Sequence, residues 1–194
     1  MIKQGTYWQY NGDTLKAIKH LLRSMHWQRA HLLLVISVAA TLFLAGEYEE
    51  LLQLVTTLEK NKMELDDWAL SGGVYADFFV LKRSFQSDDL FKNLGNIESK
   101  AAACKLFFQH LKESQVLWDG RWEAKNRVVY SRMAHELATL LLTESKTETF
   151  HGQSAELKLQ NIVMDAPVPE DDRFCRLQGA AASFTSWLLQ TVPR

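Results

Sequence analysis

Hydrophobic residues recur along most of the chain at the three- and four-residue spacing of amphipathic helices, not at the two-residue spacing of strands. The pattern predicts helices over residues 13–25, 27–45, 47–60, 66–83, 87–94, 97–117, 121–143 and 173–190. Residues 153–164 fit either a short helix or a strand, and we predict a short helix. The expected inward faces include Leu15, Ile18, Leu21, Leu22 and Met25 in the first helix, and Ala101, Cys104, Phe108 and Leu111 in residues 97–117. The sequence therefore predicts an all-α fold, a helical bundle of about seven to nine helices.

The most apolar segment, residues 32–45, is predicted to lie in a central buried helix. A helix of this length spans about 21 Å, whereas the hydrocarbon core of a bilayer is about 30 Å thick. Basic residues precede the run and acidic residues follow it, which is also the charge bias of a membrane anchor. Because an amphipathic helix follows Gly46, the sequence favours burial inside the protein and leaves a membrane anchor as the alternative.

Residues that favour helix ends mark several boundaries. Gly46 is expected to end the second helix in the left-handed conformation. Asp66 and Asp67 are expected to cap the fourth helix. This boundary places Gly72 and Gly73 inside the helix, where they would permit close packing at a cost of roughly 1 kcal/mol each.

Composition and charge narrow the functional classes. A length of 194 residues suits one domain, so we predict a single domain over residues 1–194. The net charge of −1 lacks the basic excess typical of proteins that bind nucleic acid. All three prolines lie at or after Pro167, so none interrupts the earlier helices. Cys104 and Cys175 are too few for a disulfide framework and are expected to be buried thiols.

One segment resembles the tetratricopeptide repeat. Residues 45–52, Ala-Gly-Glu-Tyr-Glu-Glu-Leu-Leu, are similar to the turn between the two helices of that repeat. Trp68, Gly72 and Tyr75 have the spacing of the family's first helix. Val35 precedes Trp68 by nearly the family's period of about 34 residues.

Other positions depart from that family. Leu51 stands where it usually has alanine, Met63 where it has proline, and Phe79 where its second turn glycine is expected. No third unit follows. The resemblance implies repeat-like, tetratricopeptide-like antiparallel hairpins within residues 32–85, and an ordinary bundle of helical hairpins is the equal alternative.

A second resemblance concerns the whole chain. The chain resembles the all-helical immunity proteins of bacterial polymorphic-toxin systems in size and in its succession of helices. These proteins have a buried helix similar to residues 39–43, Ala-Ala-Thr-Leu-Phe. A helix containing a tryptophan, here Trp68, and a polar stop, here residues 87–90, follow in both. This resemblance implies a protein that binds a cognate toxin and neutralises it by occlusion.

The chain contains no recognisable catalytic motif. His135-Glu136 could begin a zinc-protease motif, but Thr139 stands where the second histidine is needed. His20, His26 and His31 lack the three- or four-residue spacing that would place them on one helical face. No glycine-rich phosphate loop or nucleophile elbow is present. We therefore predict no enzymatic activity, no metal and no cofactor.

Two surface features are candidate partner-binding sites. The first is a predicted helix–helix turn with Trp118, Arg121 and Trp122, residue types that are enriched at binding hot spots; a corner packed by aromatic side chains is the alternative. The second is an acidic, proline-stiffened loop that could steer a basic partner, with a solvated loop as the alternative. Its acidic residues are Asp165, Glu170, Asp171 and Asp172.

These observations lead to one functional hypothesis. We expect a bacterial immunity-type protein whose partner is another protein, possessing neither nucleic-acid binding nor membrane insertion. The alternative is a tetratricopeptide-like adaptor in a larger assembly, and an enzyme with an unrecognised site is the third option. Residues 1–13 lack the apolar core of a secretory signal. Because the two isolated cysteines are expected to be free thiols, a reducing, cytoplasmic location is expected.

Overall fold

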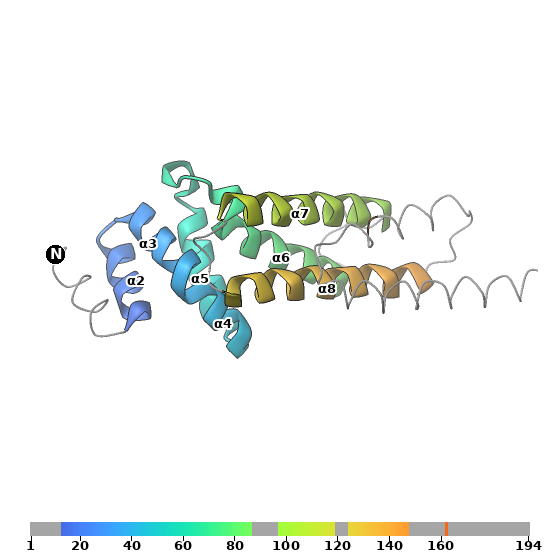
Figure 1. Cartoon of the computed structure of the whole chain (residues 1–194), viewed down its shortest axis with the longest axis horizontal. Coiled ribbons are helices and arrows are strands. Elements are labelled where there is room, and N and C mark those ends of the chain that lie inside the picture. The colour runs from blue at the N-terminus through green and yellow to red at the C-terminus, as the bar shows by residue number, and fades with distance from the viewer. Residues whose placement is uncertain (1–12, 87–96, 119–123, 148–161, 163–194) are drawn as a thin grey trace, which may run out of the picture.

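The structure, a computed structural model, describes residues 13–86, 97–118, 124–147 and 162 (Figure 1). Helices make up most of this described part, and it contains no strand, which confirms the all-α class. The α-helices are α2 (Thr14–Arg23), α3 (Trp27–Leu33), α4 (Ala39–Ala45), α5 (Tyr48–Glu59), α6 (Gly72–Gln86), α7 (Ile97–Leu117) and α8 (Ala124–Thr147). A π-helix, η1 (Leu34–Val38), joins α3 to α4, and two 3₁₀ turns, η2 (Lys62–Glu64) and η3 (Trp68–Leu70), precede α6.

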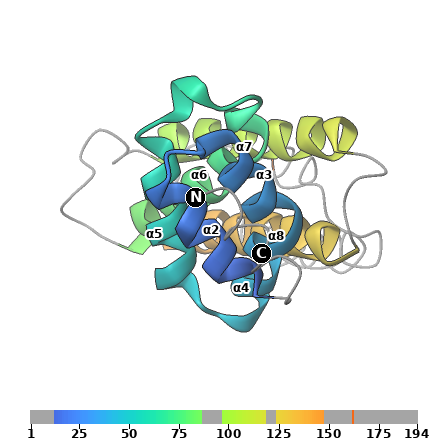
Figure 2. The same cartoon turned by 90° about the vertical axis from the view of Figure 1, so that its left-hand side faces the viewer.

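The three longest helices form one group, and the shorter helices gather at one end of it. Figure 1 shows α6, α7 and α8 running beside one another, with α2 to α5 at the left, and Figure 2 shows the same end with α2 and α3 in front. Lys100 near the start of α7 pairs with Glu144 near the end of α8, so these two helices are antiparallel. Ser114 near the end of α7 donates a hydrogen bond to the carbonyl of Leu70, just before α6, so α6 and α7 are antiparallel as well.

Aromatic side chains connect the two parts into one core. The Phe43 ring of α4 lies 5.4 Å from the Phe78 ring of α6, centroid to centroid. The Phe78 ring in turn lies 6.4 Å from Phe107 of α7, and Tyr75 of α6 lies 6.2 Å from Tyr130 of α8. All five residues belong to the same buried cluster. Phe43–Phe78 and Tyr75–Tyr130 are edge-on pairs. Because such pairs add to the free energy of area burial, this cluster fixes the short helices against the long ones.

The long apolar helix predicted over residues 27–45 is present, with an irregular middle. The backbone N–H of Ala39 bonds to the carbonyl of Leu34, five residues back, which defines the π-helical segment. Gly46 then ends the helix with φ = 81° as predicted. By length and composition Trp27–Ala45 could span a membrane, but half of its most apolar 18-residue window is buried inside the protein. Within residues 13–46 the burial favours a core helix over an anchor.

The start of α6 differs from the prediction. A 3₁₀ turn begins at Trp68, the backbone leaves helical geometry at Ser71, and α6 begins only at Gly72. Neither aspartate acts as the expected cap, because Asp66 accepts a hydrogen bond from Gln28 and the Asp67 side chain makes no capping bond. Residues 68–71 continue the helical pattern of apolar residues without forming part of α6. They do so because the Trp68 ring packs against Gly72 in the first turn of that helix.

The remaining boundaries follow the predictions with small shifts. Residues 97–117 are helical as predicted, and α8 extends beyond the predicted residue 143 to Thr147. The predicted helices 87–94 and 173–190 lie outside the described residues, as does residue range 153–164 apart from the helical Ile162. The number of helices in the whole chain therefore stays a prediction.

Candidate protein-binding surface

The turn between α2 and α3 places a methionine in an unusual backbone conformation. Met25 has φ = 58°, in the left-handed region. Its N–H donates to the carbonyl of Leu22 at 3.2 Å, and the N–H of His26 donates to that of Leu21 at 3.0 Å. These two bonds form a Schellman motif, in which the left-handed position is normally glycine. A side chain at this position costs roughly 1–2 kcal/mol.

The Met25 side chain is also exposed to solvent. It was predicted to face inward on the first helix, and that prediction is wrong, because α2 ends at Arg23 and 74% of the Met25 surface is accessible. The stripe of apolar residues continued past the helix end, and the reversal of the chain direction turned its last member outward. Nothing in the packing of the described residues accounts for a methionine at this position.

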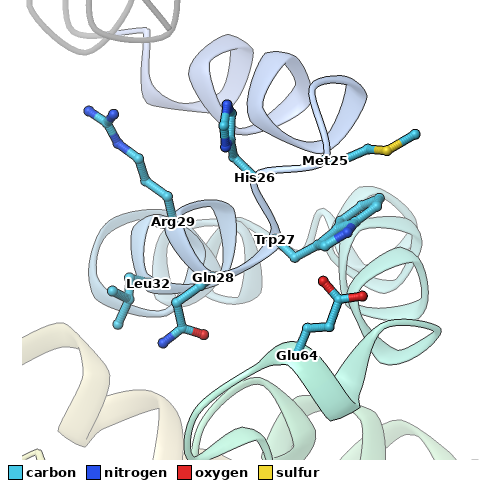
Figure 3. Close-up of a pocket in the computed structure, with 7 residues that line it drawn as sticks. All are labelled: Met25, His26, Trp27, Gln28, Arg29, Leu32 and Glu64. Atoms are coloured by element: carbon cyan, nitrogen blue, oxygen red, sulfur yellow. The ribbon is translucent and has the colours of Figure 1, made fainter.

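An open groove of about 420 Å³ lies beside this turn (Figure 3). Its lining residues are Met25, His26, Trp27, Gln28, Arg29, Leu32 and Glu64. Trp27 packs partly against the core, and Figure 3 shows its indole ring close to Glu64, on the side opposite Arg29. The groove is thus lined by three apolar side chains, with the basic Arg29 on α3 and the acidic Glu64 on η2 at opposite sides.

A pair of hydrogen bonds fixes the two walls relative to each other. The Gln28 amide donates to the Asp66 carboxylate at 2.9 Å, and its oxygen accepts from the Asp66 backbone N–H at 3.0 Å. Gln28 belongs to α3, whereas Asp66 follows η2 in the chain. This bidentate contact fixes α3 relative to the segment that follows η2.

A second exposed methionine stands next to the groove. Met63 is 92% exposed, the highest value among the large hydrophobic residues described. It precedes Glu64, a lining residue, within the short turn η2. We define the methionine surface as Met25, Trp27, Leu32 and Met63. Methionine side chains on a surface adapt their shape to a partner.

The charge around the methionine surface is mostly positive on the side of α2 and α3. Residues 14–46 contain no aspartate or glutamate. Lys16 pairs with Asp13 at 2.6 Å, and Lys19 pairs with Glu50 at 2.5 Å. Arg23 and Arg29 are exposed on the same helices. This side of the groove therefore attracts negative charge.

A buried histidine, His31, lies on α3 one helical turn after Trp27. The Nε2 atom of His31 is 2.9 Å from the Ser71 hydroxyl, which itself donates to the Asp67 carbonyl at 2.6 Å. Nε2 must therefore carry the proton of the neutral ring, and Nδ1 has no hydrogen-bond partner among the described residues. Burial lowers the pKa of His31 to about 4, against the opposing effect of Asp66 and Asp67. His31 is thus a neutral core residue at physiological pH.

Other reactive groups in the described part of the chain are buried or dispersed. Burial raises the pKa of the Cys104 thiol to about 12, so the thiol stays protonated and unreactive. Within the described ranges no three His, Cys, Asp or Glu residues gather as a metal site would require. The absence of catalytic activity stays a prediction.

The two predicted partner-binding sites fall mostly outside the described residues. Trp118 is described and is only 4% exposed, and its backbone N–H donates to the Ser114 carbonyl at 3.0 Å. Its burial agrees with the packed aromatic corner, the alternative to a hot spot. Arg121 and Trp122 lie outside the described residues, as do all four acidic residues, Asp165, Glu170, Asp171 and Asp172. Both sites stay predictions.

The methionine surface was not predicted. Its signals in the sequence were present: Met63 departs from the repeat pattern, and Met25 occupies the position after a helix end where glycine is expected. The predicted helix 13–25 includes Met25, because the exact end of a helix is hard to locate from sequence, and Met63 stood out only as a departure from the repeat pattern.

Comparison with known proteins finds a relative that is similar to almost the whole of this chain. The chain is 36% identical over 186 residues to the nuclear pore complex protein NUP96 of Arabidopsis thaliana. The alignment covers 95% of this chain and 18% of that relative, so the chain spans less than a fifth of the relative's length. The chain matches no protein-family model.

This comparison overturns the functional hypothesis drawn from the sequence. The resemblance to bacterial immunity proteins, the toxin partner and the bacterial cytoplasmic location are all wrong, because the relative is a plant nuclear pore complex protein. The resemblance failed because its motifs, an apolar helix and a tryptophan, occur in helical proteins of many kinds. The alternative of an adaptor in a larger assembly agrees better with the relative.

Proposed function

We propose that this chain is a helical scaffold segment of a nuclear pore complex subunit, and that it works by contacting neighbouring proteins. The observation that carries the proposal is the 36% identity to the plant nuclear pore protein, which extends over 95% of the chain. Identity at this level over so much of the chain indicates a shared fold, not one shared motif. The proposal involves no catalytic step, metal or cofactor.

The character of the described surface supports a binding role. Exposed large apolar residues occur on several elements, among them Met25, Met63, Val116 and Val128. The reactive groups Cys104 and His31 are buried, and neither lines the groove beside Met25. A scaffold needs the first feature and has no use for exposed nucleophiles.

We also propose that the full chain has seven to nine helices in repeat-like antiparallel hairpins. The antiparallel pairs α6–α7 and α7–α8 support this arrangement. An experimental structure of the whole chain with fewer helices, or with adjacent helices running parallel, would contradict it.

The function is tested by tagging the gene product at its own locus in the native organism. We expect a fluorescent ring at the nuclear envelope, and we expect other nuclear pore proteins to be enriched when the tagged protein is purified. A tagged protein spread evenly through the cell, with no nuclear pore protein enriched, would overturn the proposal.

A matched pair of variants shows whether folding is needed for this location. Replacing buried Phe78 by aspartate places a charge in the core and should abolish the nuclear ring. Replacing exposed Lys105 on α7 by aspartate changes the charge without touching the core and should leave the ring intact.

A further inference from the structure

We propose that the methionine surface binds an amphipathic helix of a partner protein, with the apolar face of that helix on Met25, Trp27 and Met63 and with its carboxylates facing α2 and α3. This inference rests on the proposed function and deepens it, because it names the chemistry of one contact that the scaffold makes. Three independent observations carry it: a backbone outlier, unusual exposure and a one-sided charge.

The backbone outlier is the strongest of the three. Glycine at position 25 would satisfy the Schellman motif with no steric penalty. Met25 adopts φ = 58° instead and leaves most of its side chain in water. A bulky residue held in the left-handed region indicates a functional constraint where the packing of the described residues gives no other reason for it.

The apolar area is arranged as an anchor site. The Met25 and Met63 side chains are exposed, and Trp27 is half-buried between the core and the groove. The groove of about 420 Å³ beside them has room for one or two large side chains. An amphipathic helix supplies such side chains on one face, at three- and four-residue spacing.

The charges on the two sides of the groove determine how the partner helix is oriented and where its acidic residues lie. Arg23 and Arg29 are exposed on α2 and α3, in a stretch free of acidic residues. Glu64 stands on the other side of the groove from Arg29 (Figure 3). A bound helix therefore needs acidic residues toward α3, and it needs neutral or basic residues toward Glu64.

The contact is tested in the assembled complex by photo-crosslinking. A benzophenone amino acid is incorporated at position 63 of the tagged protein in the native organism, and the crosslinked peptide is sequenced by mass spectrometry. The matched control carries the same amino acid at Leu106 on α7, another exposed hydrophobic position. We expect position 63 to yield a partner peptide with apolar residues at helical spacing and a net negative charge.

Several outcomes would overturn the inference. One such outcome is a crosslink from position 63 to a neutral or basic peptide. Another is a crosslink to a second copy of this chain or to a segment of the same chain. A third is a crosslinking yield at position 63 no greater than at position 106. If the nuclear ring persists while position 63 fails in one of these ways, the inference is wrong and the scaffold function stands. If the ring and the associated proteins are both absent, the proposed function has failed.

Variants at position 25 separate binding from folding. Met25→Gly removes the strain and the side chain, so we expect the melting temperature of the purified chain to rise by about 2–4 °C. We expect the same variant to reduce crosslinking from position 63 about tenfold. Met25→Leu keeps the strain and the apolar volume, and it should retain crosslinking. Undiminished crosslinking by Met25→Gly would overturn the role of this side chain.

Discussion

The group formed by α6, α7 and α8 and the end formed by α2, α3 and η2 differ in how they expose apolar residues. On α7, Val116 is 80% exposed but occupies an ordinary position of a regular helix. Met25 is exposed to a similar degree at a backbone angle that favours glycine. Single exposed apolar residues on helices are common. The difference teaches that exposure alone says little about function, whereas exposure combined with backbone strain indicates a selected contact.

The largest expected effect is on the core that joins the two regions. Phe78→Ala removes a ring that contacts Phe43 and Phe107, and it should lower the free energy of unfolding by about 3–5 kcal/mol. Urea denaturation followed by circular dichroism measures this loss. Val80→Ala, an exposed change on the same helix, is the control. Equal losses from both variants would show that the aromatic cluster does not connect the regions.

The second prediction concerns the dependence of stability on pH at His31. The pKa of its ring is about 4 in the folded chain and 6.5 when unperturbed. Because the unfolded chain takes up the proton first, His31 leaves stability unaffected above pH 6.5 and reduces it as the pH falls toward 4. The loss reaches roughly 3 kcal/mol.

Denaturation curves between pH 7.5 and 4 test this prediction. His31→Gln should flatten the pH dependence, since the amide does not ionise, and the exposed His135→Gln serves as control. The same pH slope in the wild type and in His31→Gln would contradict a neutral buried ring.

The third prediction separates two neighbouring glycines. A methyl group on Gly73 would lie 2.7 Å from the Trp68 carbonyl oxygen, whereas one on Gly72 would overlap the Trp68 ring. Each alanine variant should cost about 1–3 kcal/mol. In a Trp68→Leu background the penalty of Gly72→Ala should shrink more than that of Gly73→Ala. The three atoms nearest to a Gly72 methyl group all belong to the ring, whereas the atom nearest to a Gly73 methyl group is the backbone carbonyl oxygen. Equal behaviour of the two variants in that background would contradict the described packing.

The smallest expected effect is at the methionine surface itself. Met63→Ala should change the free energy of unfolding by less than about 0.5 kcal/mol, because its side chain lies in water. A loss above about 2 kcal/mol would mean that Met63 belongs to the core of the free chain.

The sequence predicts the helices well where one face is buried along a regular helix. Residues 97–117 are helical as predicted, and the expected inward residues Ala101, Cys104 and Phe108 are buried. The predicted end of the second helix at Gly46 is also confirmed. It could be predicted because a glycine directly after an apolar helical run commonly ends the helix. These features depend on local sequence alone.

The prediction fails where distant residues decide the structure. Asp66 resembles a helix cap, but its partner is Gln28, which lies 38 positions earlier in the chain. His31 gives no sign of burial in its local sequence, because Ser71 supplies its hydrogen bond. Met25 continues the apolar stripe of the first helix, and the spacing of apolar residues does not reveal that the helix ends before it. The candidate site consists of such residues, so it became visible only in three dimensions.

The π-helical segment Leu34–Val38 adds one residue to what would otherwise be a continuous α-helix. One added residue rotates the following residues by about 100° about the helix axis. This rotation determines which face of α4 contacts α5 and α8. The Lys125 ammonium group of α8 donates to the Ser37 carbonyl at 3.2 Å, within the irregular turn. A one-residue deletion here would restore a regular α-helix but would rotate Phe43 away from its aromatic neighbours. The irregular turn therefore determines which face of α4 packs against the core.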